Sequence, residues 1–289
     1  MSFGSPYTTL PDFTYHRPKT LDEVLSLLKE YGDDAKIMGG GVGLIAFMKE
    51  RLMSPGHVID IKGVKELREV KHTAGRGLRI GASVSISELV EDGVLRDDYT
   101  VLHEALAKAA DPMIRGRATL VGNLCEAIPW VDSPPALGAL DASVEIAGAD
   151  GTRSVPVSGF IRGPVDIDLG PTEVVTALEI PRVQGRRSAF EKFTAGSEFS
   201  VASVAVALWP EGEKRGAKVI YGAVNSTPVR CEEVERLLGK ELTRASVRKA
   251  ADIASEKVEC VSDVLATAEY RKHLVKVITV KALGRLLLK

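Results

Sequence analysis

The stretch Gly39-Gly40-Gly41-Val42-Gly43 decides how this chain of 289 residues is interpreted. It lies between the apolar pair Ile37-Met38 and an apolar run from Leu44 to Met48. Four glycines in five positions remove nearly every Cβ, so backbone N–H groups can converge on an anion. A strand entering and a helix leaving would aim the helix N-terminus at the same point, which favours phosphate or pyrophosphate. A flexible surface loop is the alternative, and the spacing matches neither a Walker A loop nor Gly-x-Gly-x-x-Gly.

The composition limits the class of protein. There are 38 Lys plus Arg, 39 Asp plus Glu and 5% aromatics, whereas a nucleic-acid binder is normally basic with stacking aromatics. Cys125, Cys231 and Cys260 are far apart, which predicts free thiols in a reducing compartment and no metal motif. No apolar run approaches the ~20 residues that cross a bilayer, and no signal peptide is evident. We therefore expect a cytoplasmic protein with no membrane span and no nucleic-acid partner.

The first part of the chain alternates strands and helices. A capping box at Thr20 and Glu23 predicts a helix that ends at Gly32. Strands through Ile37 and over His57–Ile61 complete a strand–turn–helix–strand unit. A second capping box, Ser85 and Glu88, predicts a helix from Ile86 towards Leu95. We expect the remaining segments to be strands at 78–82, 144–147 and 174–180, helices at 100–110 and 134–140, and an irregular stretch at 115–124.

The pattern changes after Pro181. Three strand-like segments (188–194, 200–209 and 216–224), with turn residues at 210–212, precede helices at 244–259 and 269–288. The fold class is α+β, with one domain at 1–182 (parts of about 1–60 and 61–182) and a second at 183–289. The second domain is a three-stranded antiparallel sheet with helices. Basic residues in the last helix could face an acidic partner or solvent; they are Arg271, Lys272, Lys276 and Arg285.

A second candidate site follows at Ala118-Thr-Leu-Val-Gly-Asn-Leu124. Thr119 and Asn123 supply side-chain hydrogen bonds, and Gly122 allows close backbone approach. Asp132 could accept hydrogen bonds from ribose or ribityl hydroxyls, or it could be a helix N-cap before Pro134. Two glycine-bearing turns with a carboxylate fit a long diphosphate cofactor better than a mononucleotide.

These motifs resemble those of the medium, FAD-binding subunit of the molybdenum hydroxylases, the xanthine dehydrogenase and carbon monoxide dehydrogenase group. The family has Ala-Gly-Gly-Thr-Asp-Leu-Leu followed by Met-Lys where this chain has residues 39–49, and Ala-Thr-Ile-Gly-Gly-Asn at 118–123. The resemblance covers nearly the whole chain and includes Phe13 to Pro18, Val58 to Ile61, Ile80 to Ala82, Ile114-Arg115, Asp132 to Leu137, Leu140 to Ala142, Phe190 to Lys192, Pro228 to Arg230 and Glu269 to Arg271.

The resemblance implies a fold, a cofactor and a set of contacts. The first domain would be a two-part FAD-binding domain of the vanillyl-alcohol oxidase or PCMH type, and the second a CO dehydrogenase flavoprotein C-terminal domain. FAD would be bound non-covalently, with the flavin ring between the two domains. The implied FAD-binding residues are Gly39, Gly40, Gly41, Val42, Gly43, Leu44, Ala110, Thr119, Leu120, Val121, Gly122, Asn123, Asp132, Val174 (on the adenine side) and Lys192 (near the flavin).

Three positions depart from the family pattern. Val42 and Gly43 replace a Thr-Asp or His-Ser pair, so the first turn would hold its ligand through backbone amides. Val121 replaces a glycine, which is expected to narrow the second turn. Phe199-Ser200 occupies the place of an Asp-Asp or Asp-Tyr pair beside the flavin, which affects flavin reactivity and the choice of acceptor.

The implied function is an electron-transfer flavoprotein subunit. Its partners would be an iron–sulfur small subunit with [2Fe–2S] clusters and a molybdopterin large subunit, in a dimer of heterotrimers. The chain itself would carry no metal site and no acid–base or nucleophilic catalytic residue. The alternatives are a free-standing flavin oxidoreductase and a scaffold subunit without flavin. The sequence does not choose among NAD, quinone, ferredoxin and oxygen as acceptor.

Overall fold

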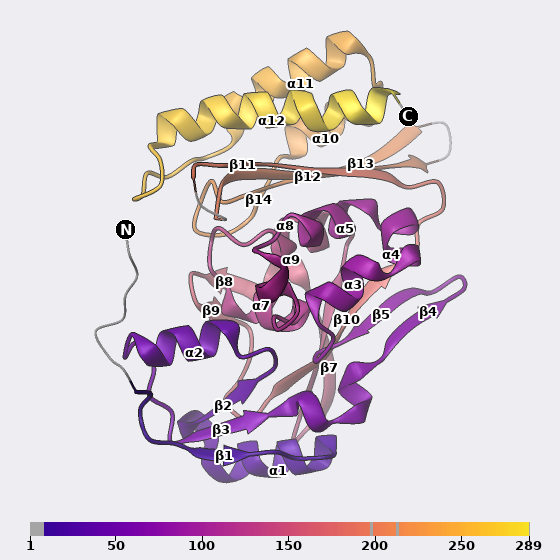
Figure 1. Cartoon of the computed structure of the whole chain (residues 1–289). Coiled ribbons are helices and arrows are strands. Elements are labelled where there is room, and N and C mark those ends of the chain that lie inside the picture. Colours follow the sequence, from indigo (N-terminus) through magenta and orange to yellow (C-terminus); the bar gives the residue numbers. More distant parts are fainter. Residues whose placement is uncertain (1–8, 197–198, 212–213, 289) are drawn as a thin grey trace.

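The computed structural model describes residues 9–196, 199–211 and 214–288, which form stacked layers of sheets and helices (Figure 1). The N-terminal unit is a parallel sheet of order β1-β3-β2 with two helices. Thr20 caps the first helix through the amide of Glu23, as predicted, but the Glu23 carboxylate accepts from the amide of Lys19, so only half of the capping box forms. The elements are β1 (Thr14–His16), α1 (Leu21–Tyr31), β2 (Ala35–Met38), α2 (Val42–Lys49) and β3 (His57–Asp60).

The middle unit contains an antiparallel sheet of order β4-β5-β10-β6-β7 with helices beside it. Its strands are β4 (Val70–Thr73), β5 (Gly77–Gly81), β6 (Ser143–Gly148), β7 (Gly151–Pro156) and β10 (Val174–Pro181), with a separate pair β8 (Ile161–Gly163) and β9 (Asp166–Ile167). Its helices are α3 (Ile86–Glu91), α4 (Gly93–Asp98), α5 (Thr100–Ala107), α6 (Pro112–Arg115), α7 (Leu120–Glu126), α8 (Ser133–Ala139) and α9 (Val157–Phe160).

Two helices differ from the sequence-based expectation. The helix expected from Ile86 towards Leu95 is interrupted, because the Asp92 side chain accepts from the amide of Leu95 and starts α4 as a new helix. The stretch 115–124, expected to be irregular, contains most of α7. There, Thr119 is the N-cap and accepts from the amide of Gly122. In both places a short side chain caps the first turn of a helix, which the apolar pattern of the sequence did not predict.

The C-terminal unit is an antiparallel sheet of order β11-β12-β13-β14 covered by helices. The expected sheet and its two long helices are present, and the short β14 adds a strand. Pro210 and Glu211 extend β12 instead of forming a turn, and Gly212 lies outside the described residues. The elements are β11 (Arg187–Thr194), β12 (Ser200–Glu211), β13 (Lys214–Gly222), β14 (Val229–Arg230), α10 (Glu232–Leu238), α11 (Arg244–Lys257) and α12 (Ala268–Leu288).

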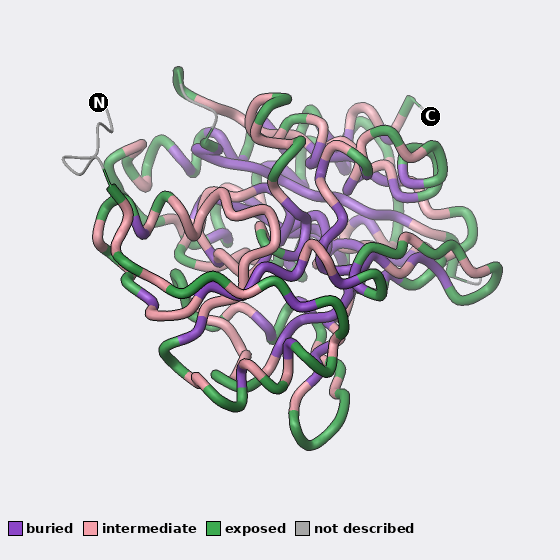
Figure 2. Tube along the Cα trace, turned by 60° about the horizontal axis from the view of Figure 1, so that its bottom comes forward, coloured by how far each residue is buried: buried purple, intermediate pink, exposed green. Residues whose placement is uncertain are grey.

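Strand β12 links the two hydrophobic cores. Ala205 and Ala207 pack into the core of the first part of the chain, whereas Val204, Val206 and Leu208 pack into the core beneath α10–α12. This alternation follows from the two-residue period of a strand. In Figure 1 the C-terminal sheet accordingly lies between α10–α12 on one side and α5 and α8 on the other. Figure 2 shows the buried chain running through the interior while exposed residues gather in the outer loops.

The basic residues of α12 do not form an open basic face. Arg271 is buried, with 1% of its side chain exposed, and pairs with Asp263 at 2.7 Å. Arg285 pairs with Glu104 and Glu191, and Lys276 pairs with an aspartate of α11. Three of the four expected basic residues therefore already have acidic neighbours in the chain, while Lys272 is exposed. Within the ranges that the structure describes, no helix has the length and apolar character needed to span a membrane.

Candidate functional site

The first glycine turn presents a row of unsatisfied backbone donors. Gly41 has φ +81° and ψ −1° and is the N-cap of α2, but it has no side chain to cap that helix. Among the described residues, the amide N–H groups of residues 40–44 have no hydrogen-bond acceptor. The first four amides of any helix lack partners within the helix, and here the glycine turn adds the amide of Gly40. An anion bound at this point would receive several N–H donors at once.

The two predicted turns lie against each other. A Cβ on Gly40 would lie 2.1 Å from the carbonyl oxygen of Arg117, and one on Gly39 would lie 2.9 Å from Oγ1 of Thr119. Gly43 lies beside Glu126 at the end of α7, where a Cβ would be 2.4 Å from Oε1. Gly40 is therefore required by the close packing of the two turns, because its neighbour is backbone, whereas the neighbours of Gly39 and Gly43 are side chains. Gly41 is required by its left-handed backbone.

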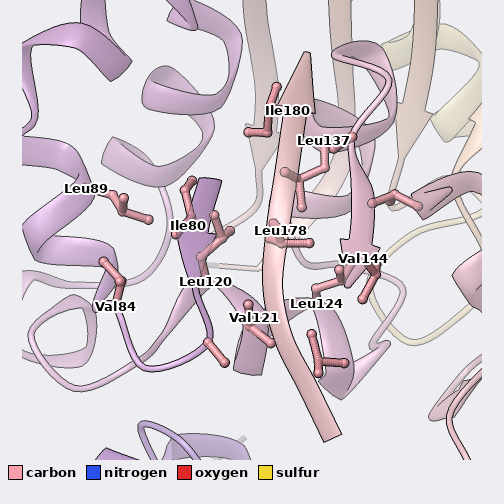
Figure 3. Close-up of a cluster of buried hydrophobic side chains, with 14 of the residues drawn as sticks. Ile80, Val84, Leu89, Leu120, Val121, Leu124, Leu137, Val144, Leu178 and Ile180 are labelled. Atoms are coloured by element: carbon pink, nitrogen blue, oxygen red, sulfur yellow. The ribbon is translucent and has the colours of Figure 1, made fainter. Parts of the chain in front are cut away.

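The second turn is the first turn of α7. Thr119 accepts from the amide of Gly122 at 3.0 Å, and a Cβ on Gly122 would meet only this hydroxyl within 4 Å, so one side of the turn is open. The expectation that Val121 narrows the turn is wrong, because its side chain is buried in the core with Leu120 and Leu124 (Figure 3). In Figure 3 this side chain lies among core residues that include Ile80 of β5 and Leu178 of β10.

Asp132 belongs to a buried polar cluster. Its Oδ2 accepts from Lys192 Nζ at 2.7 Å, and its Oδ1 accepts from Ser200 Oγ at 2.6 Å. Burial raises the pKa of Asp132, and Lys192 opposes that effect. Asp132 occupies the N-cap position of α8, as the alternative expected, but its side chain makes no capping hydrogen bond there. Ser133 donates to Asn123 Oδ1 at 2.6 Å and thereby connects this cluster to the second turn.

Two further expected residues are Ala110 and Val174. Ala110 follows α5 with φ +43°, which is rare for a residue with a side chain. Arg115 Nη1 holds it by donating to its carbonyl oxygen at 2.7 Å. Val174 is buried at the start of β10, in the same core as α7. The structure thus brings the turns, Asn123, Asp132 and Lys192 into one connected group.

Sequence reasoning missed three residues of this region. Glu126 lies beside Gly43, and burial raises the pKa of its carboxyl group. Lys62 donates to the carbonyl oxygen of Gly39 at 3.0 Å. Trp130 contacts Phe199 edge to face, with 5.7 Å between ring centroids, and its ring lines a cavity of about 390 Å³. None of the three belongs to a glycine motif, and no local pattern in the sequence marks them.

The cavity lies between α2, the loop after α7 and the C-terminal unit. Its walls are largely apolar and include Phe47, Pro129 and Val165 on one side and Ala223 and Val261 on the other. Among the described residues, no group of three or more His, Cys, Asp or Glu side chains is placed to hold a metal ion. The region therefore offers backbone amides and two lysine–aspartate pairs, Lys192–Asp132 and Lys62–Asp60, beside a largely apolar cavity.

Comparisons with known proteins agree with this arrangement. Residues 11–183 match the family described as FAD binding domain in molybdopterin dehydrogenase, and residues 189–286 match the CO dehydrogenase flavoprotein C-terminal domain. The glyceraldehyde dehydrogenase medium chain of Sulfolobus acidocaldarius is 33% identical, over 94% of this chain and 97% of the relative. The carbon monoxide dehydrogenase medium chain of Hydrogenophaga pseudoflava is 32% identical, over 95% of this chain and 96% of the relative.

Solved structures give the same result. A crystal structure of the Cu,Mo-CO dehydrogenase in its cyanide-inactivated form contains a chain with TM-score 0.90 and 30% identity, covering 97% of this chain and 99% of that chain. A chain of quinoline 2-oxidoreductase from Pseudomonas putida 86 has TM-score 0.89 and 29% identity, covering 97% of this chain and 98% of that chain. The two-domain FAD-binding fold is thereby confirmed. The chain is therefore an oxidoreductase component and belongs to the family of FAD-binding medium subunits of the molybdenum hydroxylases.

Proposed function

We propose that this chain is the electron-transfer flavoprotein of a molybdenum hydroxylase complex. It would receive electrons from [2Fe–2S] clusters in a small partner subunit, after substrate oxidation at a molybdopterin centre in a large partner subunit, and deliver them to an external acceptor. We further propose a dimer of heterotrimers in the cytoplasm and a division of this chain at 1–182 and 183–289. The medium-chain relatives, which match over nearly their whole length, support this proposal.

The row of unsatisfied amides at residues 40–44 is the observation that carries the proposal. The FAD pyrophosphate is an anion of the size that such a turn binds, and the open side of Gly122 permits close approach of a ligand. The residues proposed to hold FAD are Gly39, Gly40, Gly41, Val42, Gly43, Leu44, Ala110, Thr119, Leu120, Val121, Gly122, Asn123, Asp132, Val174 and Lys192.

The protein's own groups bind and orient the cofactor. Backbone amides of the two turns would donate to phosphate oxygens. Both carboxylate oxygens of Asp132 already accept hydrogen bonds from Lys192 and Ser200, so this carboxylate would place the lysine ammonium at the cofactor. Bound FAD supplies the electron transfer, while the chain sets its orientation and the local charge.

Spectroscopy of the purified chain and of the complex tests the proposal. We expect the chain, incubated with FAD and desalted, to show flavin absorption bands at one FAD per chain and no turnover alone. The complete complex should reduce an artificial acceptor with the substrate of the molybdenum subunit, and removal of FAD should stop that reduction. A colourless chain that FAD cannot reconstitute would support the scaffold alternative. Turnover by the isolated chain would support a free-standing oxidoreductase.

A further inference from the structure

Lys62 lies beside the first glycine turn, at the same edge of the N-terminal sheet. It belongs to the short 3₁₀ turn Ile61–Gly63 that follows β3. β2 and β3 are parallel, and Met38 pairs with Asp60 at their carboxyl ends. The segments that follow these strands therefore leave the sheet at one edge, where open α/β sheets bind ligands. Lys62 Nζ reaches across this edge and donates to the carbonyl oxygen of Gly39 at 3.0 Å.

Side chains from neighbouring strands hold Lys62 in place. Asp60 is buried, and its Oδ1 accepts from Lys62 Nζ at 2.8 Å and from the Lys62 amide at 2.9 Å. The hydroxyl of Tyr15 on β1 donates to the other oxygen of Asp60. Ser83 Oγ donates to the carbonyl of Ile61 at 3.1 Å and ties the 3₁₀ turn to the segment after β5. The ammonium group is thus held by Asp60 on one side and donates to Gly39 on the other.

Fixing the carbonyl of Gly39 also fixes the next amide. The peptide unit that joins Gly39 to Gly40 is planar and trans, so its N–H points opposite to its C=O. A carbonyl held towards Lys62 therefore turns the N–H of Gly40 away from Lys62. This N–H is the first of the unsatisfied donors at residues 40–44. Glycine has no side chain to restrict this peptide, so without Lys62 it could rotate.

We propose that Lys62 is a positioning residue for cofactor binding, which orients the Gly39–Gly40 peptide so that its amide donates to the FAD pyrophosphate. This inference rests on the proposed function of the chain as an FAD-binding subunit. It assigns Lys62 to the phosphate-binding half of the site. The turn has no polar side chains at Val42 and Gly43, so a positioned backbone amide replaces a side-chain donor there.

The test compares ligands with and without phosphate. The full-length apoprotein and the variants Lys62→Met and Lys62→Arg are titrated with FAD, ADP and riboflavin. We expect Lys62→Met to lower the affinities for FAD and ADP about tenfold, which is the effect of one lost charge-assisted hydrogen bond. The affinity for riboflavin should stay within about twofold of the wild-type value. Lys62→Arg should restore most of the FAD affinity, because it keeps a cationic donor. Lys65→Met, at an exposed lysine of the next turn, is the matched control and should bind all three ligands like the wild type.

The outcomes separate this inference from the proposed function. Equal weakening of FAD and riboflavin by Lys62→Met would indicate a general structural role and would overturn the inference. Unchanged FAD affinity in Lys62→Met would overturn it as well, while leaving the proposed function intact. A wild-type chain that binds no FAD would overturn both. If Lys62→Met does not fold, Asp60→Asn, which keeps the lysine but removes its charged anchor, should show the same selective loss for FAD and ADP.

Discussion

At the scale of single residues, the backbone conformation of Gly41 restricts this position to glycine. Its φ of +81° lies in the left-handed region, and a Cβ there would lie 3.1 Å from Sδ of Met38. A β-branched residue in this conformation costs about 1–2 kcal/mol, and relaxation to another conformation would move the amides of residues 42–44. The turn therefore depends on one backbone geometry, because it has no polar side chain to compensate.

We expect Gly41→Val to lose FAD binding by at least about 100-fold, measured by fluorescence titration of the apoprotein, because the displaced amides no longer converge on one anion. Gly75→Val is the matched control. Gly75 has φ +80°, and a Cβ there would have no heavy atom within 4 Å, so the substitution carries a similar backbone cost away from the site. This control should lose stability but keep FAD. Stoichiometric FAD in Gly41→Val would contradict the assignment of the first turn.

At the scale of elements, α7 connects the core to the second turn. Its apolar residues Leu120, Val121 and Leu124 pack among β5, β6, β10 and α8 (Figure 3), while its first turn faces the glycine turn of α2. Thr119 holds the start of this helix through the amide of Gly122. A helix whose N-terminus is anchored in this way keeps its first amides in a fixed position.

We expect Thr119→Ala to lower the free energy of unfolding by about 1 kcal/mol, the usual effect of a lost N-cap, and also to weaken FAD binding. Thr243→Ala removes the corresponding cap from α11, where Thr243 accepts from the amide of Ser246 at 3.1 Å. It should cost similar stability and leave FAD affinity unchanged. Urea unfolding and FAD titration of both variants provide the comparison. Equal FAD affinities in the two variants would exclude the start of α7 from the site.

At the scale of the whole molecule, Arg285 ties the last helix to the first half of the chain. On α12, it donates to Glu104 of α5 and, at 2.7 Å, to Glu191 of β11. Glu104 also accepts from the amide of Phe190 at 2.9 Å. The hydrogen bonds that Arg285 donates to Glu104 raise the pKa of Arg285 above its ordinary value; burial opposes this effect, and the bond to Glu191 adds to it. This cluster joins the layers on both sides of β11.

We expect Arg285→Met to lower the free energy of unfolding by about 1–2 kcal/mol and to broaden the urea transition, because the two carboxylates lose their shared cation and the halves of the chain lose a connection. Arg236→Met is the control: its pair with Glu233 leaves 69% of the arginine side chain exposed, so the change should stay below about 0.5 kcal/mol. Equal losses in the two variants would show that Arg285 is an ordinary surface cation.

The sequence by itself determined the local elements and the position of the first turn. Side-chain caps at Thr20 and Ser85, the left-handed glycine at the end of α1 and the alternation of β12 all act over a few residues. Such short-range preferences can be identified in a linear sequence. They located the strand, turn and helix around Gly39–Gly43. They failed at Asp92 and Thr119, where a single side-chain cap started a helix that the apolar pattern did not indicate.

Only the tertiary structure decided which partners these residues have. Asp132 meets Lys192 across 60 residues of chain, and Glu104 meets Arg285 across 181. Val121 packs into the core, and Lys62 reaches the carbonyl of Gly39 from the turn that follows the neighbouring strand β3. These contacts depend on sheet order and on how the layers pack, which no local preference encodes. The sequence therefore determined where an anion could bind, and the tertiary structure decided which side chains hold that turn in place.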